Sequence, residues 1–99
     1  MDIKEAEEEI KRIVLKHLGH GFKVFLFGSR AFGEAGKWSD FDVGIEGARP
    51  VELKVLGLIN EELENSQIPY KIDVVDFSRV SKAFKKSALK DVKVWKKKE

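Results

Sequence analysis

The sequence predicts a small α/β protein of the α+β kind, with a mixed three-stranded sheet and helices mainly on one face. Three apolar runs of strand length, rich in Phe, Val and Ile, supply the strands; they are Phe22–Phe27, residues 40–46 and residues 70–75. A helix-length segment, residues 50–65, separates the second and third runs, so these two strands should be parallel with a right-handed crossover. The shorter connection between the first two runs allows an antiparallel pair.

The first element is an amphipathic helix over residues 2–18. Its apolar residues recur with helical spacing along one side, and they are Ile3, Ala6, Ile10, Ile13 and Val14. Gly19 follows this segment, at a place where helices commonly stop. His17 and His20 flank that end, and we interpret both as helix-end residues rather than as metal ligands.

Gly28 and Ser29 close the first strand, and a short helix is expected to start at Ser29. Glycine lets the backbone approach a ligand closely, and the free N–H groups of the helix, with the Ser29 hydroxyl, would face an anion. Taken alone, a Gly-Ser pair after a strand is an ordinary turn. Arg30 either reaches a triphosphate or is solvated, and Trp38, in the following loop, either stacks on a base or covers the edge of the core.

Two carboxylates, Asp40 and Asp42, open the second strand. In a strand they share one face, with Cα atoms roughly 7 Å apart. Asp40 alone is compatible with a cap on the turn, but Asp42 lies inside an apolar run, where an unpaired carboxylate is costly and requires a cation or several donors. Such a pair can bind two Mg²⁺ ions set about 3.5–4 Å apart, which clamp the attacking and leaving oxygens of a phosphoryl or nucleotidyl transfer.

A third carboxylate, Asp73, lies in the middle of the run 70–75, on the face opposite to Ile72 and Val74. If this strand lies beside the second strand, Asp73 reaches the same metal site. Asp76 comes just past the end of the run, and we expect it to cap the first turn of the next segment rather than to act as the third ligand. Three acids from two neighbouring strands, with water and substrate phosphates, would suit octahedral Mg²⁺.

The remaining segments are read as helices. Pro50 is expected at the first position of the helix over residues 50–65, whose inward side chains are Val55, Leu56, Ile59 and Leu63. A last helical region is expected over residues 78–97, and it is strongly basic, with Asp91 as its single acid. This basic surface suits nucleic acid or an acidic protein, but we favour a solvated helix face whose lysines complement the helix dipole.

Composition favours one folded domain over residues 1–99. The 42% hydrophobic content excludes a disordered chain, and no apolar stretch approaches the roughly 20 residues that span a bilayer. The acidic start is unlike a signal peptide, and the lack of cysteine excludes a disulfide framework or a thiolate metal site. The cytoplasm is therefore the expected location.

The motif Gly28-Ser29, ten residues, then Asp40 and Asp42, with Asp73 on a later strand, resembles that of the DNA polymerase β-type nucleotidyltransferase superfamily. The short length is similar to the minimal nucleotidyltransferase branch, whose members are often antitoxin partners of HEPN-domain ribonuclease toxins. The resemblance covers most of the chain and implies a nucleotidyltransferase fold.

By this resemblance, Asp40 and Asp42 would bind both metal ions, while Asp73 would bind the catalytic ion and help to deprotonate the acceptor. Gly28 and Ser29 would contact the nucleotide phosphates. The implied reaction is Mg²⁺-dependent transfer of AMP from ATP to a hydroxyl, with release of pyrophosphate.

One short domain leaves no length for a separate acceptor domain, so the acceptor site is expected from a partner protein or a second copy of the chain. The resemblance implies a HEPN-type toxin modified on tyrosine. Two competing classes are an inactive subunit that neutralises its partner by occlusion and a nucleic-acid-binding module that uses the basic C-terminal segment.

Overall fold

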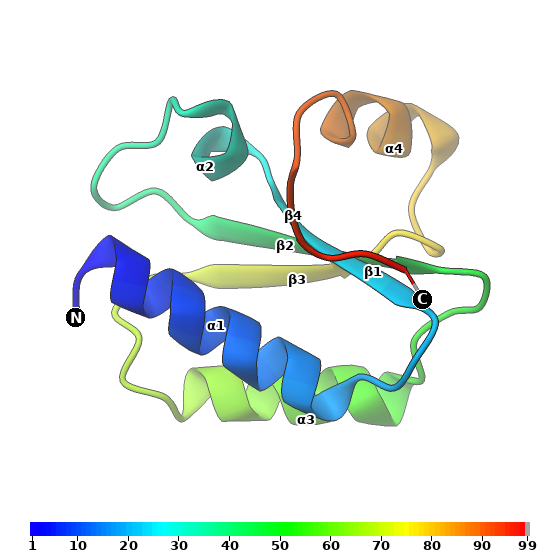
Figure 1. Ribbon diagram of the computed structural model, residues 1–99, viewed down its shortest axis with the longest axis horizontal. Coiled ribbons are helices and arrows are strands. Elements are labelled where there is room, and N and C mark those ends of the chain that lie inside the picture. Colours follow the sequence, from blue (N-terminus) through cyan, green and yellow to red (C-terminus); the bar gives the residue numbers. More distant parts are fainter. Residues whose placement is uncertain (99) are drawn as a thin grey trace.

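The computed structural model describes residues 1–98 as one sheet between two layers of helices (Figure 1). The elements in chain order are α1 (Ile3–His17), β1 (Phe22–Phe27), α2 (Ser29–Phe32), β2 (Phe41–Gly47), α3 (Leu53–Glu64), β3 (Ile72–Asp76), α4 (Lys82–Ala88) and β4 (Lys93–Lys96).

The sheet has the strand order β3-β2-β1-β4. β1 pairs with β2 in antiparallel fashion, and β2 pairs with β3 in parallel, as the connection lengths predict. The register sets Asp42 beside Phe27 on one side and beside Asp73 on the other. Two of the three predicted acids therefore lie next to each other across the β2–β3 pair.

The two long helices, α1 and α3, cover one face of the sheet, which agrees with the prediction (Figure 1). Asp2 caps α1 because its carboxylate accepts the N–H of Glu5 while the Glu5 carboxylate accepts the N–H of Asp2. At the other end of α1, Nε2 of His17 lies 2.8 Å from Oε1 of Glu62 on α3, consistent with a helix-end role. The fully buried core of this face combines the two helices with β1 and β2; its residues include Ile10, Ile13, Val14, Val24, Leu26, Phe41, Val43, Ile45 and Ile59.

The opposite face of the sheet is only partly open. A second apolar cluster, Phe25, Phe27 and Phe77, lies there and is covered by partly buried residues from β3, α4 and the segments that flank α4. The rings of Phe25 and Phe77 are 5.0 Å apart, and Phe84 of α4 packs against Phe77 at 5.7 Å. The predicted placement of the helices mainly on one face would leave this face open, but the half of the sheet beneath α4 is covered. The half that carries Asp42 and Asp73 lies beyond this cluster.

The predicted C-terminal helix over residues 78–97 is wrong. The helix, α4, begins after its cap Ser81, whose hydroxyl accepts the N–H of Phe84, and it ends at Ala88. The chain then turns and adds β4 to the free edge of β1, so the sheet has four strands rather than three. The physical reason is that β1, an apolar strand, would otherwise expose an edge of unpaired N–H and C=O groups.

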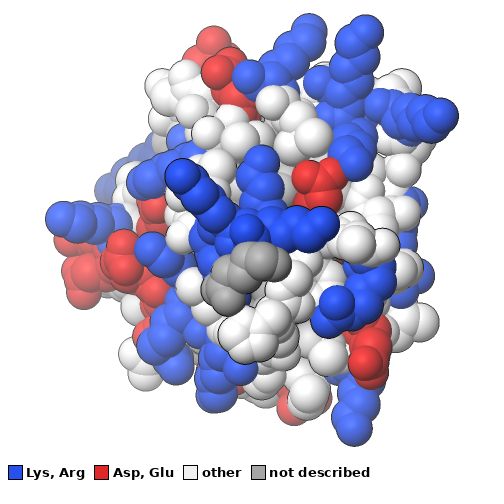
Figure 2. All heavy atoms as spheres, turned by 45° about the vertical axis from the view of Figure 1, so that its right-hand side comes forward, with Lys and Arg blue, Asp and Glu red and all other residues white. Residues whose placement is uncertain are grey.

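The helix predicted from Pro50 begins three residues later, at Leu53, with Glu52 as its N-cap. No helix within residues 1–98 has both the length and the apolar character needed to cross a membrane. Lysine and arginine side chains gather on the face that carries the C-terminal segment (Figure 2).

Candidate active site

Asp42 is the centre of the candidate site. It projects from β2 on the same face as Phe25 and Phe27, and its side chain is half-buried. No hydrogen bond or ion pair joins its carboxylate to a donor within residues 1–98, and its oxygens are not sealed from solvent. Burial raises the pKa of the Asp42 carboxyl, repulsion from Asp73 and Asp40 raises it further, and Lys71 opposes this rise.

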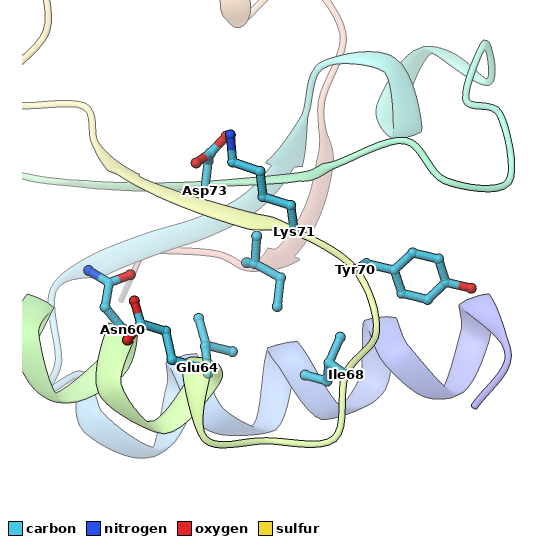
Figure 3. A pocket seen from close by; sticks show the side chains of 8 residues that line it. Asn60, Glu64, Ile68, Tyr70, Lys71 and Asp73 are labelled. Atoms are coloured by element: carbon cyan, nitrogen blue, oxygen red, sulfur yellow. The ribbon is translucent and has the colours of Figure 1, made fainter.

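Asp73 projects from β3 on the same side of the sheet. The close-up shows Asp73 and Lys71 both pointing away from α3, as the predicted alternation requires (Figure 3). Because β2 and β3 are parallel and in register at Asp42 and Asp73, these two carboxylates form adjacent members of one row. Neither is neutralised by an ion pair in the described residues.

Asp40 lies one residue before β2 rather than inside it. It is close enough to raise the pKa of Asp42, so the structure brings all three predicted acids into one electrostatic neighbourhood. Within residues 1–98, however, no three carboxylate or imidazole side chains are already placed to enclose a metal ion.

The backbone at Gly28 lies directly against the Asp42 side chain and leaves no room for a Cβ. Its φ of +75° belongs to the left-handed region, and a Cβ added at this position would lie 2.3 Å from Oδ2 of Asp42. Ser29 follows directly as the first residue of α2. The backbone therefore passes close to the carboxylate at the point where a ligand could contact both.

The residues present fit a divalent cation by their chemistry. Mg²⁺ prefers oxygen ligands and is commonly bound by one or two carboxylates together with substrate phosphates rather than by a protein cage. Asp42 and Asp73 offer two adjacent carboxylates without protein donors, and Asp40 lies nearby. Within residues 1–98 no three side chains enclose a cation, which is consistent with a metal site that nucleotide phosphates help to complete.

Arg30 contacts the segment that leads into β2. Its guanidinium donates from Nη2 to the carbonyl of Ser39 at 2.7 Å and lies 4.1 Å from the ring centre of Phe41. These contacts fasten the loop before Asp40 to α2. Arg30 thus positions this loop in the structure, and a phosphate contact from its side chain stays a prediction.

Trp38 lies on the same loop and is 68% exposed. Its ring is 5.7 Å from that of Tyr70, which in turn packs edge-on against Phe41 at 5.5 Å. Trp38 therefore extends an aromatic row outward from the core edge rather than sealing the core.

Asp76 is a residue whose role the sequence reveals only in part. It is 5% exposed, and its carboxylate accepts the N–H of Val51 at 2.8 Å, both the N–H and the hydroxyl of Ser78, and Nε of Arg79. Burial opposes its ionisation, but these hydrogen bonds outweigh burial and lower its pKa. Asp76 organises the turn after β3, as its expected capping role suggests, and also ties that turn to the start of α3.

A cavity of about 480 Å³ opens beside Asp73, between β3 and α3 (Figure 3). Its polar lining comes from both elements and the chain before β3: Asn60, Glu64, Lys71 and Asp73. Sequence patterning could not locate this cavity, because it depends on how α3 packs beneath an edge strand.

Comparisons with known proteins agree with this geometry. The family model of a nucleotidyltransferase domain matches residues 4–96. A probable protein adenylyltransferase, MntA, of Haemophilus influenzae is 32% identical over 85 residues, which cover 86% of this chain and 75% of that protein.

Among solved structures, a chain of a toxin–antitoxin crystal structure with AMP-PNP gives a TM-score of 0.71 at 19% identity, covering 89% of this chain and 70% of that one. A chain from the complex of tri-AMPylated Shewanella oneidensis HEPN toxin with MNT antitoxin gives 0.68 at 16% identity, covering 92% and 69%. At these identities the two structures support the fold.

Proposed function

Since the chain belongs to the nucleotidyltransferase domain family, we propose that it moves AMP from ATP to a hydroxyl group of a partner protein. The single observation that carries this proposal is the adjacent pair Asp42 and Asp73, which no protein donor neutralises and against which Gly28 leaves room. If these acids had only a structural role, hydrogen-bond donors would be expected around their carboxylates, as they are found around the carboxylate of Asp76.

The proposed step is a displacement at the α-phosphorus of ATP. The acceptor oxygen forms a new bond to that phosphorus, the bond to the oxygen bridging the α- and β-phosphates breaks, and pyrophosphate leaves. A carboxylate oxygen of Asp73 takes the acceptor proton. Gly28 and Ser29 contact the phosphates and orient them.

Asp40 and Asp42 would hold two Mg²⁺ ions, and Asp73 would share one of them. Bound there, Mg²⁺ would neutralise phosphate charge and polarise the reacting phosphoryl group. The supporting observation is the raised pKa of Asp42, because a cation would relieve the burial and carboxylate repulsion that cause it. We propose that the reaction takes place in the cytoplasm, where ATP is available.

The proposed acceptor is a tyrosine of a HEPN-type toxin, and the chain would serve as its antitoxin. Two findings support this choice. The curated relative from Haemophilus influenzae is a probable protein adenylyltransferase, and a structurally similar chain comes from a complex that contains a tri-AMPylated HEPN toxin.

The test is to mix the chain with ATP, Mg²⁺ and the protein encoded by the adjacent reading frame, and to measure the mass of that protein. We expect a gain of one or more AMP units, mapped by peptide sequencing to tyrosine. The Asp73→Asn variant should lose transfer much more than ATP affinity, because its proposed proton acceptance matters in the transition state. Neutralisation of the partner without any AMP gain would instead support an inactive binding subunit.

A further inference from the structure

The strand that carries Asp73 has one open edge. β3 is the terminal strand of the sheet and pairs only with β2 within residues 1–98. Four of its five residues are half-buried rather than buried. The open edge faces the cavity between β3 and α3.

The hydrogen-bonding pattern shows which groups lie on that edge. The carbonyl of Lys71 accepts the N–H of Phe41, and the N–H of Phe77 donates to the carbonyl of Ile45, so both residues direct their backbone toward β2. Backbone direction alternates along a strand, which places Asp73 in the same set. The N–H and C=O groups of Ile72 and Val74 therefore point outward and have no partner in the described residues.

A strand that pairs with Ile72 and Val74 would present one residue directly opposite Asp73. In antiparallel pairing this would be a non-hydrogen-bonded pair, whose Cα atoms approach to about 4.5 Å and whose side chains share a face. That face is the one that carries Asp73 and, on the neighbouring strand, Asp42. Pairing at this edge would therefore place a side chain of the added strand next to Asp73 and Asp42.

The surroundings favour a foreign strand over a second copy of β3. Two copies paired antiparallel about Asp73 would set two carboxylates directly opposite each other, which is destabilising. The cavity of about 480 Å³ beside this edge offers space and polar groups, Asn60 and Glu64 of α3, to an incoming segment. A long hydroxyl-bearing side chain opposite Asp73 would extend over the row rather than away from it.

We propose that the acceptor protein docks by adding an extended segment to the open edge of β3, with its hydroxyl-bearing residue opposite Asp73. Main-chain hydrogen bonds to Ile72 and Val74 would supply the affinity for the acceptor segment. The register of the pairing would decide which of its residues lies opposite Asp73. This inference rests on the proposed function and specifies how the acceptor binds.

Val74 offers a matched pair of variants. Proline at 74 removes the outward N–H but no bond to β2, and proline is tolerated at edge positions whose N–H faces outward. Val74→Ala keeps the N–H and loses the same contacts with the core, against which Val74 packs. We expect Val74→Pro to transfer AMP to the protein of the adjacent reading frame at least about tenfold more slowly than Val74→Ala, with equal ATP affinity.

Hydrogen exchange on the unaltered chain gives a second measurement that does not depend on folding of the variant. The amides of Ile72 and Val74 should become protected when the partner is added with a non-hydrolysable ATP analogue. Equal transfer rates for the two variants, or amides that stay unprotected in the complex, would overturn the strand-addition mode. Protection of these amides in the chain alone, together with dimerisation, would assign the edge to a second copy. An unaltered chain that modifies nothing would instead refute the proposed function itself.

Discussion

The Asp42 carboxylate illustrates how one side chain can be costly to the fold and useful to the chemistry. Its raised pKa, caused by burial and then by Asp73 and Asp40, means that ionisation is less favourable in the folded protein than in the unfolded chain. At neutral pH the metal-free fold therefore carries a penalty, which falls as the pH drops through the raised pKa and the group protonates.

The Asp42→Asn variant should relieve this penalty while it removes the chemistry. We expect AMP transfer to be abolished and the melting temperature in EDTA at pH 7 to rise slightly, on the order of 2 °C for a domain of this size. Thermal melts measure the change in stability, and radiolabelled AMP measures the transfer. In a separate experiment, calorimetry on the unaltered chain should show that ATP binding requires Mg²⁺. A large drop in melting temperature would mean that Asp42 supports the fold.

Gly28 can be tested against Gly33, a second glycine with a positive φ but with a ψ of 11° in place of −158°. Gly28 and Gly33 have φ of +75° and +77°, but an added Cβ meets Asp42 only at Gly28 and meets nothing within 4 Å at Gly33. Gly28→Ala should therefore cost both stability and ATP affinity, whereas Gly33→Ala should cost only the stability lost through strain, about 1 kcal/mol. Melting curves and ATP titrations separate the two, and similar ATP affinities would argue against a role of Gly28 in ATP binding.

Asp76 should control acid stability. Its pKa is lowered in the fold because the hydrogen bonds outweigh burial, so its stabilisation is present above the unfolded pKa of about 3.9 and is lost as the pH falls through the lower folded pKa. Asp76→Asn should lose about 1–3 kcal/mol at pH 7, because an amide cannot accept from all these donors, and the loss should shrink toward pH 3. Denaturant unfolding at several pH values measures this; a loss that does not vary with pH would contradict it.

The side chains of the site were predictable to the extent that they follow strand alternation. Asp42 and Asp73 were placed on one face by period-two patterning, and the structure confirms their adjacency. Asp76 was not predictable in full, because one of its partners, Val51, lies 25 residues away in the sequence and reaches it only through tertiary packing. The position of Arg30 was open for the same reason: its partners are loop carbonyls.

Among the elements, the C-terminal segment shows where patterning fails. Its apolar residues fit one face of a helix, but three of them are used differently: Leu89 and Val92 cover the second apolar cluster and Trp95 packs on the main core. Phe84 and Val94 remain as exposed apolar side chains of this segment, at 43% and 41%. The need of β1 for a second partner, which no local pattern encodes, decides the outcome.

The attachment of β4 to α1 depends on Glu7. Its carboxylate accepts Nε1–H of Trp95 at 3.0 Å and pairs with Lys93 at 2.7 Å. Glu7→Ala should lose about 1 kcal/mol and lower the melting temperature by about 4–8 °C. Glu8→Ala is the control, because no hydrogen bond or ion pair joins the Glu8 carboxylate to residues 1–98. Equal effects of the two substitutions would contradict this anchoring role.

The molecule as a whole carries a formal charge of only +2, but the charge is unevenly distributed. The C-terminal segment concentrates lysines on one face, and several of them, including Lys86 and Lys90, are exposed without an ion pair (Figure 2). Such a surface speeds encounter with an acidic partner and loses this effect in salt.

Neutralising these lysines should slow association more than it changes the chemistry. Lys86→Gln with Lys90→Gln should lower the association rate with the acceptor protein several-fold at low salt, and the difference should vanish near 0.5 M salt. Lys4→Gln with Lys54→Gln removes the same charge from exposed positions elsewhere. Stopped-flow association rates provide the measurement. Salt-dependent binding of RNA by the unaltered chain, lost in the first variant alone, would favour a nucleic-acid partner instead.

The central position of β1 has a consequence for how the protein is made. β1 is nearly all apolar, and β4, which covers one of its edges, leaves the ribosome after the other three strands of the sheet. Until then one edge of this hydrophobic strand has no partner, and an unpaired hydrophobic edge is a recognised template for aggregation. A chain that stops before β4 would therefore keep this edge of β1 exposed and be prone to aggregate.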